Sequence, residues 1–476
     1  MKNSNLAAKT DLPALYTVAD AAAMSNRTAY ELFARHINPS LGKMMNMLGF
    51  AGKRPVRAEN TTITFDDGAE VIDFTAQFGI MNMGHNHPRI LAARAAWAQQ
   101  RQLEIWKFFP SPYQGALAHN LAQILPDDLE VVFFCNSGAE ANEGAMKMAS
   151  KVAGPDRRIV VHTDISFHGK THATLSVSGS ESHQNKHFKL MPDTVAIPFG
   201  DADALERVFK EHKSTFGKTK VSTFIVEAIR AEGVRTPPPG YFTRVRALCT
   251  KYDVTLILDE VFTGFGRTGK MFAFNHYNFT PDIVTFSKAF GGGKGSFGGF
   301  VARQGIFQQA YGNMKDATVH STTYNGFGEE IVSAIEAINI LHEEDLLENA
   351  RVQGEYLVQR LETLMARHAI MKEVRGVGLL CCVRFENVAA KFASLIPGAA
   401  SQIVAKLTTG GIINQLFEKH NILTYSPPHD FDLLFLTPPL TITRAEIDRL
   451  VDALDEVLKT NLLETTQKFL KKYVEA

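Results

Sequence analysis

The sequence predicts an α/β protein with a mostly parallel central sheet, together with a smaller α+β domain built from both chain ends. Short apolar runs of strand length alternate with helix-length segments from about residue 115 to Tyr324, a pattern typical of a parallel sheet covered on both faces. Beyond Tyr324 long amphipathic helices dominate. At 476 residues the chain is too long for one simple domain. We therefore expect an N-terminal arm and part of the small domain in 1–74, a large domain in 75–340 and the rest of the small domain in 341–476.

The N-terminal region contains one predicted helix and one predicted hairpin. The first 25 or so residues have the composition of a loosely held arm. A helical pattern runs from Arg27 to Leu48. The segment from Ile63 to Phe74 then predicts two strands joined by a turn at Asp67 and Gly68.

The remaining elements follow from the length and periodicity of the apolar runs. In the central region we expect strands at 131–134, 158–162, 223–226, 255–258 and 281–286, with helices at 139–151 and 241–252. Toward the C-terminus we expect a long helix at 329–367, a strand at 376–385, and helices at 400–419 and 443–458.

Composition excludes several classes of function. Lys plus Arg and Asp plus Glu each number 50, so neither a nucleic acid nor an anionic membrane is expected as the main partner. The first residues lack the apolar core of a signal peptide, and no apolar run approaches the length of a membrane span. The four cysteines have no metal-ligand spacing and are interpreted as buried reduced thiols. We expect a cytoplasmic protein without a metal site.

A first candidate site is Asn136-Ser-Gly-Ala-Glu-Ala-Asn-Glu143, which follows a predicted strand and opens a helix. Free N–H groups at a helix N-terminus bind anions, and a Ser-Gly pair lets a phosphate approach the backbone. The alternative is a plain helix cap, with Ser137 as N-cap and Glu140 completing a capping box. The segment alone favours the cap.

A second candidate is Asp259, which ends the apolar run Leu256-Ile-Leu-Asp. Open α/β sheets bind ligands at the carboxyl ends of their strands. A carboxylate there can keep a pyridinium nitrogen protonated, coordinate magnesium, or cap a helix. The chain contains no Gly-x-x-x-x-Gly-Lys-Ser/Thr loop, which argues against the magnesium–nucleotide alternative.

A third candidate is Lys288, in Phe286-Ser-Lys-Ala-Phe-Gly-Gly-Gly293 at the end of another strand. A desolvated lysine loses its proton easily and becomes a nucleophilic amine. Most single lysines are surface cations, but a position between a strand and a glycine run is a poor place for one.

Together these segments resemble the class III (subgroup II) pyridoxal 5′-phosphate (PLP) aminotransferases over about residues 51–458. The most specific matches are 259–269 and 281–288, and weaker ones are 84–88, 166–169, 375–379 and 438–442. The resemblance implies the PLP-dependent transferase fold type I, with 75–340 as the PLP-binding domain.

The resemblance also implies roles for individual residues. Lys288 would form a Schiff base with PLP and then shuttle a proton, and Asp259 would pair with the pyridine nitrogen. Thr323 matches a threonine that reaches the phosphate from a neighbouring subunit, which implies a homodimer with shared active sites. The other implied cofactor-binding residues are Ser137, Gly138, Ala139, Phe167, His168, Glu227 and Val261.

Departures from the family pattern bear on the substrate. An arginine that commonly precedes the Pro-Pro-Leu segment is here Phe435, and Phe78 resembles a position that faces the substrate side chain. Both are apolar, so we expect an amine donor on an apolar or extended chain. Arg230 stands where the family has glutamine and is our candidate for gripping a keto acid. The alternative is that Phe435 is core and that Arg267 or Arg375 holds the carboxylate.

The reaction that the resemblance implies is ping-pong transamination between a small-molecule amine and a keto acid or aldehyde. A PLP-dependent lyase, epimerase or decarboxylase would use the same lysine and aspartate. A cofactor-free binding or scaffold protein on this fold is the alternative from another class, although intact Lys288 and Asp259 weigh against it.

Overall fold

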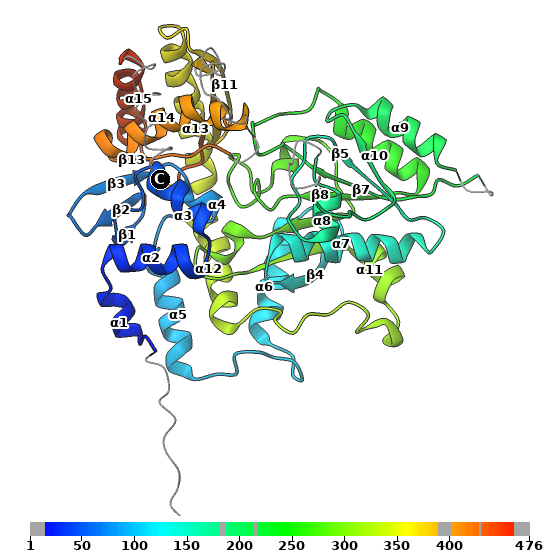
Figure 1. Ribbon diagram of the computed structural model, residues 1–476. Coiled ribbons are helices and arrows are strands. Elements are labelled where there is room, and N and C mark those ends of the chain that lie inside the picture. Colours follow the sequence, from blue (N-terminus) through cyan, green and yellow to red (C-terminus); the bar gives the residue numbers. More distant parts are fainter. Residues whose placement is uncertain (1–14, 180–186, 214–216, 389–400, 428–429, 461–476) are drawn as a thin grey trace, which may run out of the picture.

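A seven-stranded sheet, which we call the central sheet, is the largest sheet of the described residues and lies in the right-hand part of Figure 1. The computed structural model describes residues 15–179, 187–213, 217–388, 401–427 and 430–460. The strands lie in the order β4 (Leu129–Cys135), β10 (Gly298–Arg303), β9 (Ile283–Phe286), β8 (Thr255–Asp259), β7 (Val221–Glu227), β5 (Ile159–Thr163) and β6 (Thr194–Ile197). Only β10 runs antiparallel to its neighbours within this sheet. The predicted α/β class with a mostly parallel sheet is confirmed.

Both faces of this sheet are buried, because successive residues of its inner strands contribute to different cores. In β7, Phe224 and Val226 join the larger core, whereas Ile225 between them joins a second core with Met146 and Phe300. Helix α7 (Gly138–Ala153) covers the second face, and α6 (Pro112–Ile124) packs near β4. Near-continuous apolar strands are what a sheet covered on both faces requires.

Two smaller sheets lie beside the central one, at the left and top in Figure 1. One joins both chain ends: β1 (Pro55–Glu59), β2 (Thr62–Phe65), β3 (Glu70–Asp73) and β13 (Ile422–Leu423), with β13 parallel to β3. The other is antiparallel: β11 (Met371–Val377), β12 (Leu380–Phe385) and β14 (Leu433–Leu436). The hairpin predicted at Asp67 and Gly68 forms between β2 and β3.

The other helices of four or more residues complete the layers around these sheets. They are α1 (Val18–Ala23), α2 (Asn26–His36), α3 (Pro39–Met47), α4 (Ala76–Gly79), α5 (Pro88–Gln100), α8 (His172–Ser176), α9 (Ala202–Glu211), α10 (Tyr241–Tyr252), α11 (Gln304–Tyr311), α12 (Gly328–Glu343), α13 (Leu346–Met365), α14 (Ser401–His420) and α15 (Arg444–Lys459), with 3₁₀ turns η2 (Ala273–His276) and η3 (Lys288–Gly291). Residue 400, where we expected the helix at 400–419 to begin, lies outside the described residues.

Two of the predicted continuous helices are each broken. The helix expected from Arg27 to Leu48 is α2 and α3, because the Asn38 side chain accepts a hydrogen bond from the Leu41 N–H at 3.0 Å and Pro39 opens the new helix. The helix expected at 329–367 is α12 and α13, separated by Asp345 with a φ of +49°. A left-handed residue ends a right-handed helix.

The strand expected at 376–385 is also divided. It is the end of β11 and all of β12, joined at Gly378, whose φ is +56°. A Cβ at Gly378 would lie 2.4 Å from the backbone carbon of Thr268, so only glycine fits this turn. The arm expected in the first 25 residues contains α1 within its described part.

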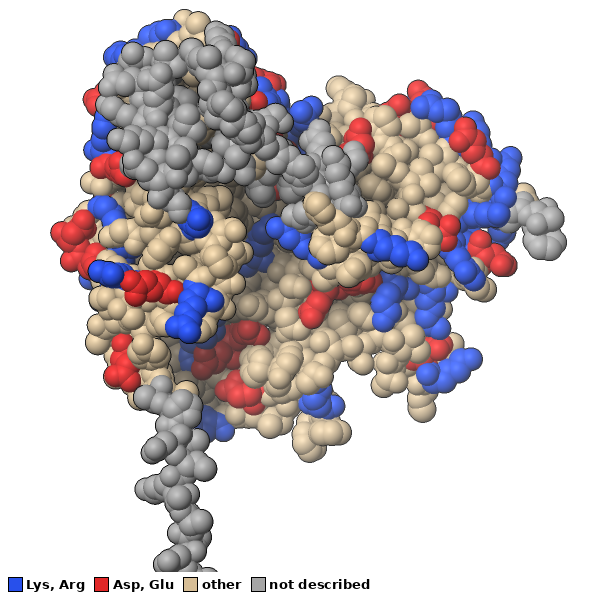
Figure 2. All heavy atoms as spheres, viewed as in Figure 1, with Lys and Arg blue, Asp and Glu red and all other residues tan. Residues whose placement is uncertain are grey.

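Charged side chains are interspersed on the face shown in Figure 2, with no large area of one sign. No helix among the described residues is long and apolar enough to cross a membrane.

Candidate active site

The carboxyl ends of β4, β7, β8 and β9 meet at one edge of the central sheet. Glu227, Asp259 and Thr285 are register partners across β7, β8 and β9 at this edge. The start of α7 follows β4, and Lys288 follows β9. The three segments that the sequence singled out therefore converge where parallel sheets bind ligands.

Asp259 is a buried carboxylate that stays charged. It accepts hydrogen bonds from His168 Nδ1 at 2.7 Å, Asn142 Nδ2 at 2.8 Å and the Val261 N–H at 2.9 Å. Burial alone would raise the pKa of Asp259, but these hydrogen bonds and the nearby His168 outweigh burial and lower the pKa below its ordinary value.

Asn142 and Thr285 form a support for Asp259 that the sequence did not reveal. The buried Asn142 amide also donates to the backbone oxygen of His168 at 2.9 Å, and its own oxygen accepts from Thr285 Oγ1 at 2.7 Å. This network fixes the orientation of the Asp259 carboxylate. Asn142 lies within the quoted 136–143 segment, but helical spacing alone does not show which strand its side chain meets.

Lys288 is a half-buried amine in an unusual backbone conformation. Its φ is +48°, in the left-handed region that non-glycine residues rarely occupy and that is commonly found at functional sites. Burial lowers the pKa of Lys288 to about 8, against the opposing effect of Asp259 and Glu227. The Nζ atom lies 4.1 Å from the centroid of the Phe262 ring.

The N-terminus of α7 is capped at Ser137. The Ser137 hydroxyl accepts from the Glu140 N–H at 3.2 Å, while the Glu140 carboxylate accepts from the Asn136 N–H at 2.7 Å. The carboxylate thus bonds one residue earlier than a standard capping box requires. Among the described residues the Ser137 hydroxyl donates no hydrogen bond, so its hydrogen can be offered to an anion.

Close packing requires small residues at the start of α7. A Cβ at Gly138 would lie 2.7 Å from Val261 Cγ1, and a Cβ at Gly169 would lie 2.9 Å from the Cβ of Ala139. The first turn of α7 therefore lies directly against Val261 and the segment that carries Phe167 and His168.

Glu227 links the Phe167 segment to Arg230. Its carboxylate accepts from the Phe167 N–H at 3.2 Å and from the Ala231 N–H at 3.2 Å. Arg230 is buried and contacts Glu227 at 3.3 Å and Glu232 at 3.1 Å. Burial alone would lower the pKa of Arg230, but these two carboxylates raise it. Arg230 is thus a fully charged guanidinium held by two internal carboxylates.

Four aromatic rings, which we call the aromatic row, connect the surface to Lys288. The ring centroids of Phe78 and Tyr425 are 4.9 Å apart, those of Tyr425 and Phe435 5.4 Å, and those of Phe435 and Phe262 5.8 Å. Phe78 is 57% exposed, whereas Phe435 is 0% exposed. Phe435 lies in the core behind Tyr425, so its effect on a substrate would pass through its neighbours.

Phe78 lies in a left-handed turn. Residues 76–79 have φ values of +41°, +50°, +62° and +77°, and only the last of them is glycine. The turn is anchored because the Thr75 N–H donates to Asp73 at 2.7 Å and Thr437 Oγ1 donates to the Thr75 carbonyl at 2.9 Å. Such strain persists only where surrounding contacts hold it.

The two alternative arginines are engaged elsewhere. Arg267 is completely buried, and its guanidinium donates to the backbone oxygens of Leu379 and Pro438 and to Asn82 Oδ1. Arg375 pairs with Glu373 and donates to the Gly233 carbonyl. Arg267 thus joins the segment after β8 to the turn between β11 and β12 and to the segment after β14, and it has no exposed surface for a substrate.

Thr323 is exposed and lies in the segment between β10 and α12. In the parts of the chain that the structure describes, it makes no hydrogen bond with the residues around Lys288 and Asp259.

His85 and His87, two residues apart in the sequence, each contact a carboxylate. His85 bonds to Asp73 at 2.8 Å and His87 contacts Glu344 at 3.2 Å. No cluster of three or more His, Cys, Asp or Glu side chains suited to a metal occurs within the described ranges.

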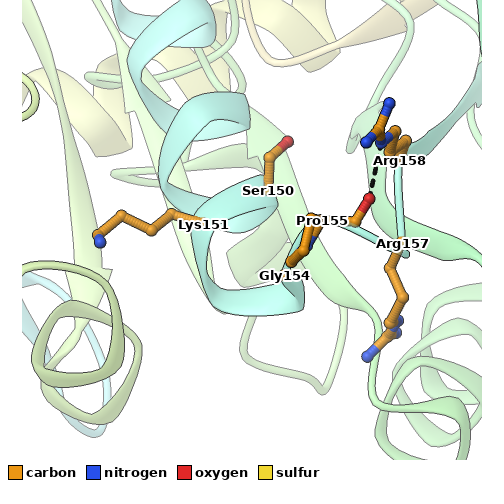
Figure 3. A pocket seen from close by; sticks show the side chains of 6 residues that line it. All are labelled: Ser150, Lys151, Gly154, Pro155, Arg157 and Arg158. Carbon is orange, nitrogen blue, oxygen red and sulfur yellow. Dashed lines mark hydrogen bonds between the residues drawn. The ribbon is translucent and has the colours of Figure 1, made fainter.

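A separate pocket of about 350 Å³ lies at the far end of α7 from Ser137 (Figure 3). Its cations already have partners: Lys151 pairs with Asp316 at 3.1 Å, and Arg157 with Asp253 at 2.8 Å. The Arg158 side chain donates to the Pro155 carbonyl, the dashed line in Figure 3. We assign this pocket no part in the chemistry.

Comparison with known proteins identifies the family. The model of the class III aminotransferases matches residues 51–458. The chain is 32% identical to a putrescine aminotransferase from Pectobacterium atrosepticum, over 92% of this chain and 90% of that protein. It is also 32% identical to the aminotransferase PigE from a Serratia species, over 83% of this chain, but it spans only about half (49%) of PigE.

Solved structures agree in fold. An (S)-enantioselective omega-transaminase from Thermomicrobium roseum superposes with a TM-score of 0.79 and 27% identity, covering 94% of this chain and 99% of that one. The chain therefore belongs to the class III aminotransferases, a family of PLP-dependent transaminases.

Proposed function

We propose that Lys288 and Asp259 carry the transamination, and that the amino donor presents a primary amine on an apolar or extended chain. The observation that best supports the reaction is the convergence of an amine of lowered pKa, a charged buried carboxylate and a helix N-terminus at one sheet edge. A keto acid or aldehyde accepts the amino group, so that the two halves alternate in a ping-pong sequence.

The residues at this edge fit PLP, which has a phosphate, a ring nitrogen and an aldehyde. Ser137, Gly138 and Ala139 begin α7 and suit the phosphate. Asp259 suits a protonated ring nitrogen, and the Lys288 amine suits the aldehyde. When bound, PLP withdraws electrons from the carbon that bears the amino group. The residues proposed to enclose the ring are Val261, Phe167, His168 and Glu227.

Lys288 is proposed to move the proton between the amine-bearing carbon of the substrate and the cofactor. A group with a pKa of about 8 is partly neutral near pH 7, so it can accept a proton and return it. The apolar Phe262 ring beneath its Nζ atom keeps water away from the amine.

The donor preference rests on the aromatic row. Phe78 and Tyr425 offer aromatic surface, and the residue at the family's arginine position, Phe435, cannot bind a carboxylate bidentately. The relatives named as a putrescine aminotransferase and an omega-transaminase support a donor with a terminal amine. Free α-amino acids would find no carboxylate clamp at this position.

Arg230 is the proposed grip for an acceptor carboxylate. Its guanidinium is already shared between Glu227 and Glu232. A substrate carboxylate could bind Arg230 only by replacing one of these contacts, so an amine donor and a keto acid would meet different charge arrangements in the same site.

A homodimer with shared active sites is proposed from the surface around Thr323. Lys107 donates to the Thr322 carbonyl and ties the segment near residue 108 to that near residue 322. These two segments expose large apolar side chains together: Leu103 51%, Phe108 92%, Phe109 64%, Met314 95%, Val319 50% and Tyr324 50%. An exposed apolar surface of this kind is typical of an interface, and a second copy of the chain is the proposed occupant.

A cytoplasmic location is likewise proposed. Its support is that Cys135, Cys249, Cys381 and Cys382 are all buried and free, as is usual where thiols stay reduced.

A half-reaction screen tests the proposed function. Enzyme loaded with PLP would be mixed with putrescine, long-chain and aromatic amines, and several α-amino acids, while conversion to the pyridoxamine form is followed by absorbance. Terminal amines are expected to convert the cofactor faster than α-amino acids. Rapid conversion by α-amino acids alone would overturn the donor assignment. Release of carbon dioxide or phosphate, or racemisation, without pyridoxamine formation would indicate a decarboxylase, lyase or epimerase instead.

A further inference from the structure

The Nζ atom of Lys288 lies over the face of an aromatic ring. Within the described residues it donates no hydrogen bond and forms no ion pair, and it lies 4.1 Å from the centroid of Phe262. We propose that Phe262 is a positioning residue whose ring holds the Lys288 amine in place whenever the lysine is free of the cofactor. This inference rests on the proposed function, since it requires Lys288 to be the reactive lysine.

The Phe262 ring is itself held from two sides. On one side Gly79 lies so close that a Cβ there would be 3.3 Å from Phe262 Cζ. On another side the buried ring of Phe435 lies 5.8 Å away at an interplanar angle of 43°. Phe262 follows Asp259 by three residues, so the chain that positions the carboxylate also positions the ring. A ring held in this way can fix the position of a flexible lysine.

An aromatic ring suits a lysine that must gain and lose a proton. Its face attracts an ammonium ion, with a strength of about 0.5–2 kcal/mol, yet it carries no formal charge and leaves the lone pair of the neutral amine free. A carboxylate in direct contact would instead favour the charged form strongly.

The charged groups near Lys288 are already paired with other residues, so the Phe262 ring is the group that positions the amine. Burial lowers the pKa of Lys288 to about 8, with Asp259, Glu227 and Glu232 acting to raise it and Arg230 to lower it. Asp259 already accepts from His168, Asn142 and the Val261 N–H, and Glu227 and Glu232 are paired with Arg230. Replacing the ring by an aliphatic side chain should therefore destabilise the ammonium form and release the amine from its position.

The test uses holoenzyme loaded with pyridoxamine 5′-phosphate, in which Lys288 is free. Acetylation of Lys288 by dilute acetic anhydride would be followed across pH by mass spectrometry of its peptide, in wild type, Phe262→Leu, Phe262→Met and Phe262→Tyr. Phe279→Leu is the matched control, because Phe279 is also half-buried and stacks on Phe242 at 4.6 Å away from the site. The rate of the amine half-reaction and its deuterium isotope effect at the amine-bearing carbon would be measured in parallel.

In Phe262→Leu and Phe262→Met the pH midpoint is expected to fall by about one unit. The half-reaction should slow by about tenfold with a larger isotope effect, since a misplaced amine impairs proton transfer. Phe262→Tyr and Phe279→Leu should keep the wild-type midpoint. An unchanged or raised midpoint in both aliphatic variants would overturn the inference. Borohydride reduction of the PLP form separates the two failures: a label on another lysine rejects the proposed function, whereas a label on Lys288 with wild-type midpoints rejects only the part assigned to Phe262.

Discussion

At the scale of single residues, the proposed site contains a carboxylate, Asp259, that is buried and yet charged. Asp259 is 4% exposed, and three hydrogen bonds to its two oxygens offset the cost of burial. The charge is what the ring nitrogen of PLP requires of a partner.

We predict that Asp259→Asn keeps the yellow colour of bound PLP but lowers the rate of the amine half-reaction by about 100-fold or more. An amide cannot hold the ring proton by charge, so the electron-withdrawing power of the cofactor falls. Absorbance spectra and stopped-flow rates check both parts. A variant within a few-fold of wild type would show that Asp259 is not the electron-sink partner.

Arg230 gives a prediction that separates the two half-reactions. Arg230→Ala should raise the KM for a keto acid acceptor by about tenfold or more and leave the amine half-reaction nearly unchanged. Arg235→Ala is the matched control, because Arg235 is exposed and pairs with Arg230 only through the backbone. Equal effects of both variants, or an effect of Arg230→Ala on the amine half alone, would remove Arg230 as the acceptor grip.

The positions of some site residues could be predicted from the sequence. The positions of others could not, because they depend on how separate elements pack. That Asp259 and Lys288 lie at the same sheet edge could be predicted, because Asp259 ends an apolar strand, Lys288 follows another by two residues, and the carboxyl ends of parallel strands converge. Asn142 and Phe262 lie within 136–143 and 259–269, but the sequence assigns them no role, because their contacts depend on packing between elements. Arg230 is held by Glu227 and Glu232 because of the path that the chain takes after β7. The periodicity of apolar residues in the sequence does not reveal that path.

At the scale of elements, the loop after β8 is organised by a second buried acid. Glu260 is 0% exposed and accepts from Thr263 Oγ1 at 2.5 Å, the Ala273 N–H at 3.0 Å and the Phe274 N–H at 2.8 Å. Burial raises the pKa of Glu260 to about 7 despite these bonds. The loop that leads from Asp259 to η2 is thus closed around a carboxyl that titrates near neutrality.

This raised pKa predicts a pH dependence of stability. Because the folded protein binds the Glu260 proton more tightly than the unfolded chain, whose ordinary value is 4.5, the resulting stabilisation is complete below about pH 4.5 and is lost as pH rises through about 7. The effect is on the order of 3 kcal/mol. Thermal unfolding from pH 5 to pH 8 should show wild type losing stability relative to Glu260→Gln. A Glu362→Gln control on the exposed face of α13 should follow wild type, and parallel curves for all three would contradict the prediction.

Elements were predicted well where one local signal dominates and poorly where a single residue interrupts a long pattern. The strands β7, β8 and β9 are continuous apolar runs and were predicted within a few residues. The breaks at Pro39 and Asp345 were missed because amphipathic periodicity continues across both. Strand β10 was missed because its glycine-rich start, Gly298-Gly299, suggests a loop. These glycines are needed within the sheet, because a Cβ at Gly299 would lie 2.4 Å from the Phe133 carbonyl oxygen.

At the scale of the whole molecule, the proposed homodimer would complete each site with a residue from the second copy. Thr323 is exposed, beside the apolar surface around Phe108 and Met314. If that surface is the dimer interface, Thr323 would reach the partner's phosphate site rather than its own.

We predict that Thr323→Ala raises the dissociation constant for PLP by about tenfold, the usual cost of losing a hydrogen bond to a charged group, while the dimer stays intact. Cofactor retention after dialysis and sedimentation velocity measure the two properties separately. Thr322→Ala, one residue away, serves as control. A fully active monomer would contradict the shared-site arrangement.

The central claim is that Lys288 is the lysine that binds the cofactor, and reduction with borohydride tests it most directly. The holoenzyme is expected to be yellow, to lose its visible absorbance on reduction, and to yield one phosphopyridoxyl peptide that contains Lys288. Lys288→Ala should be folded and colourless, with no labelled peptide. A phosphopyridoxyl group on any other lysine, or an unchanged visible absorbance in Lys288→Ala, would contradict the account.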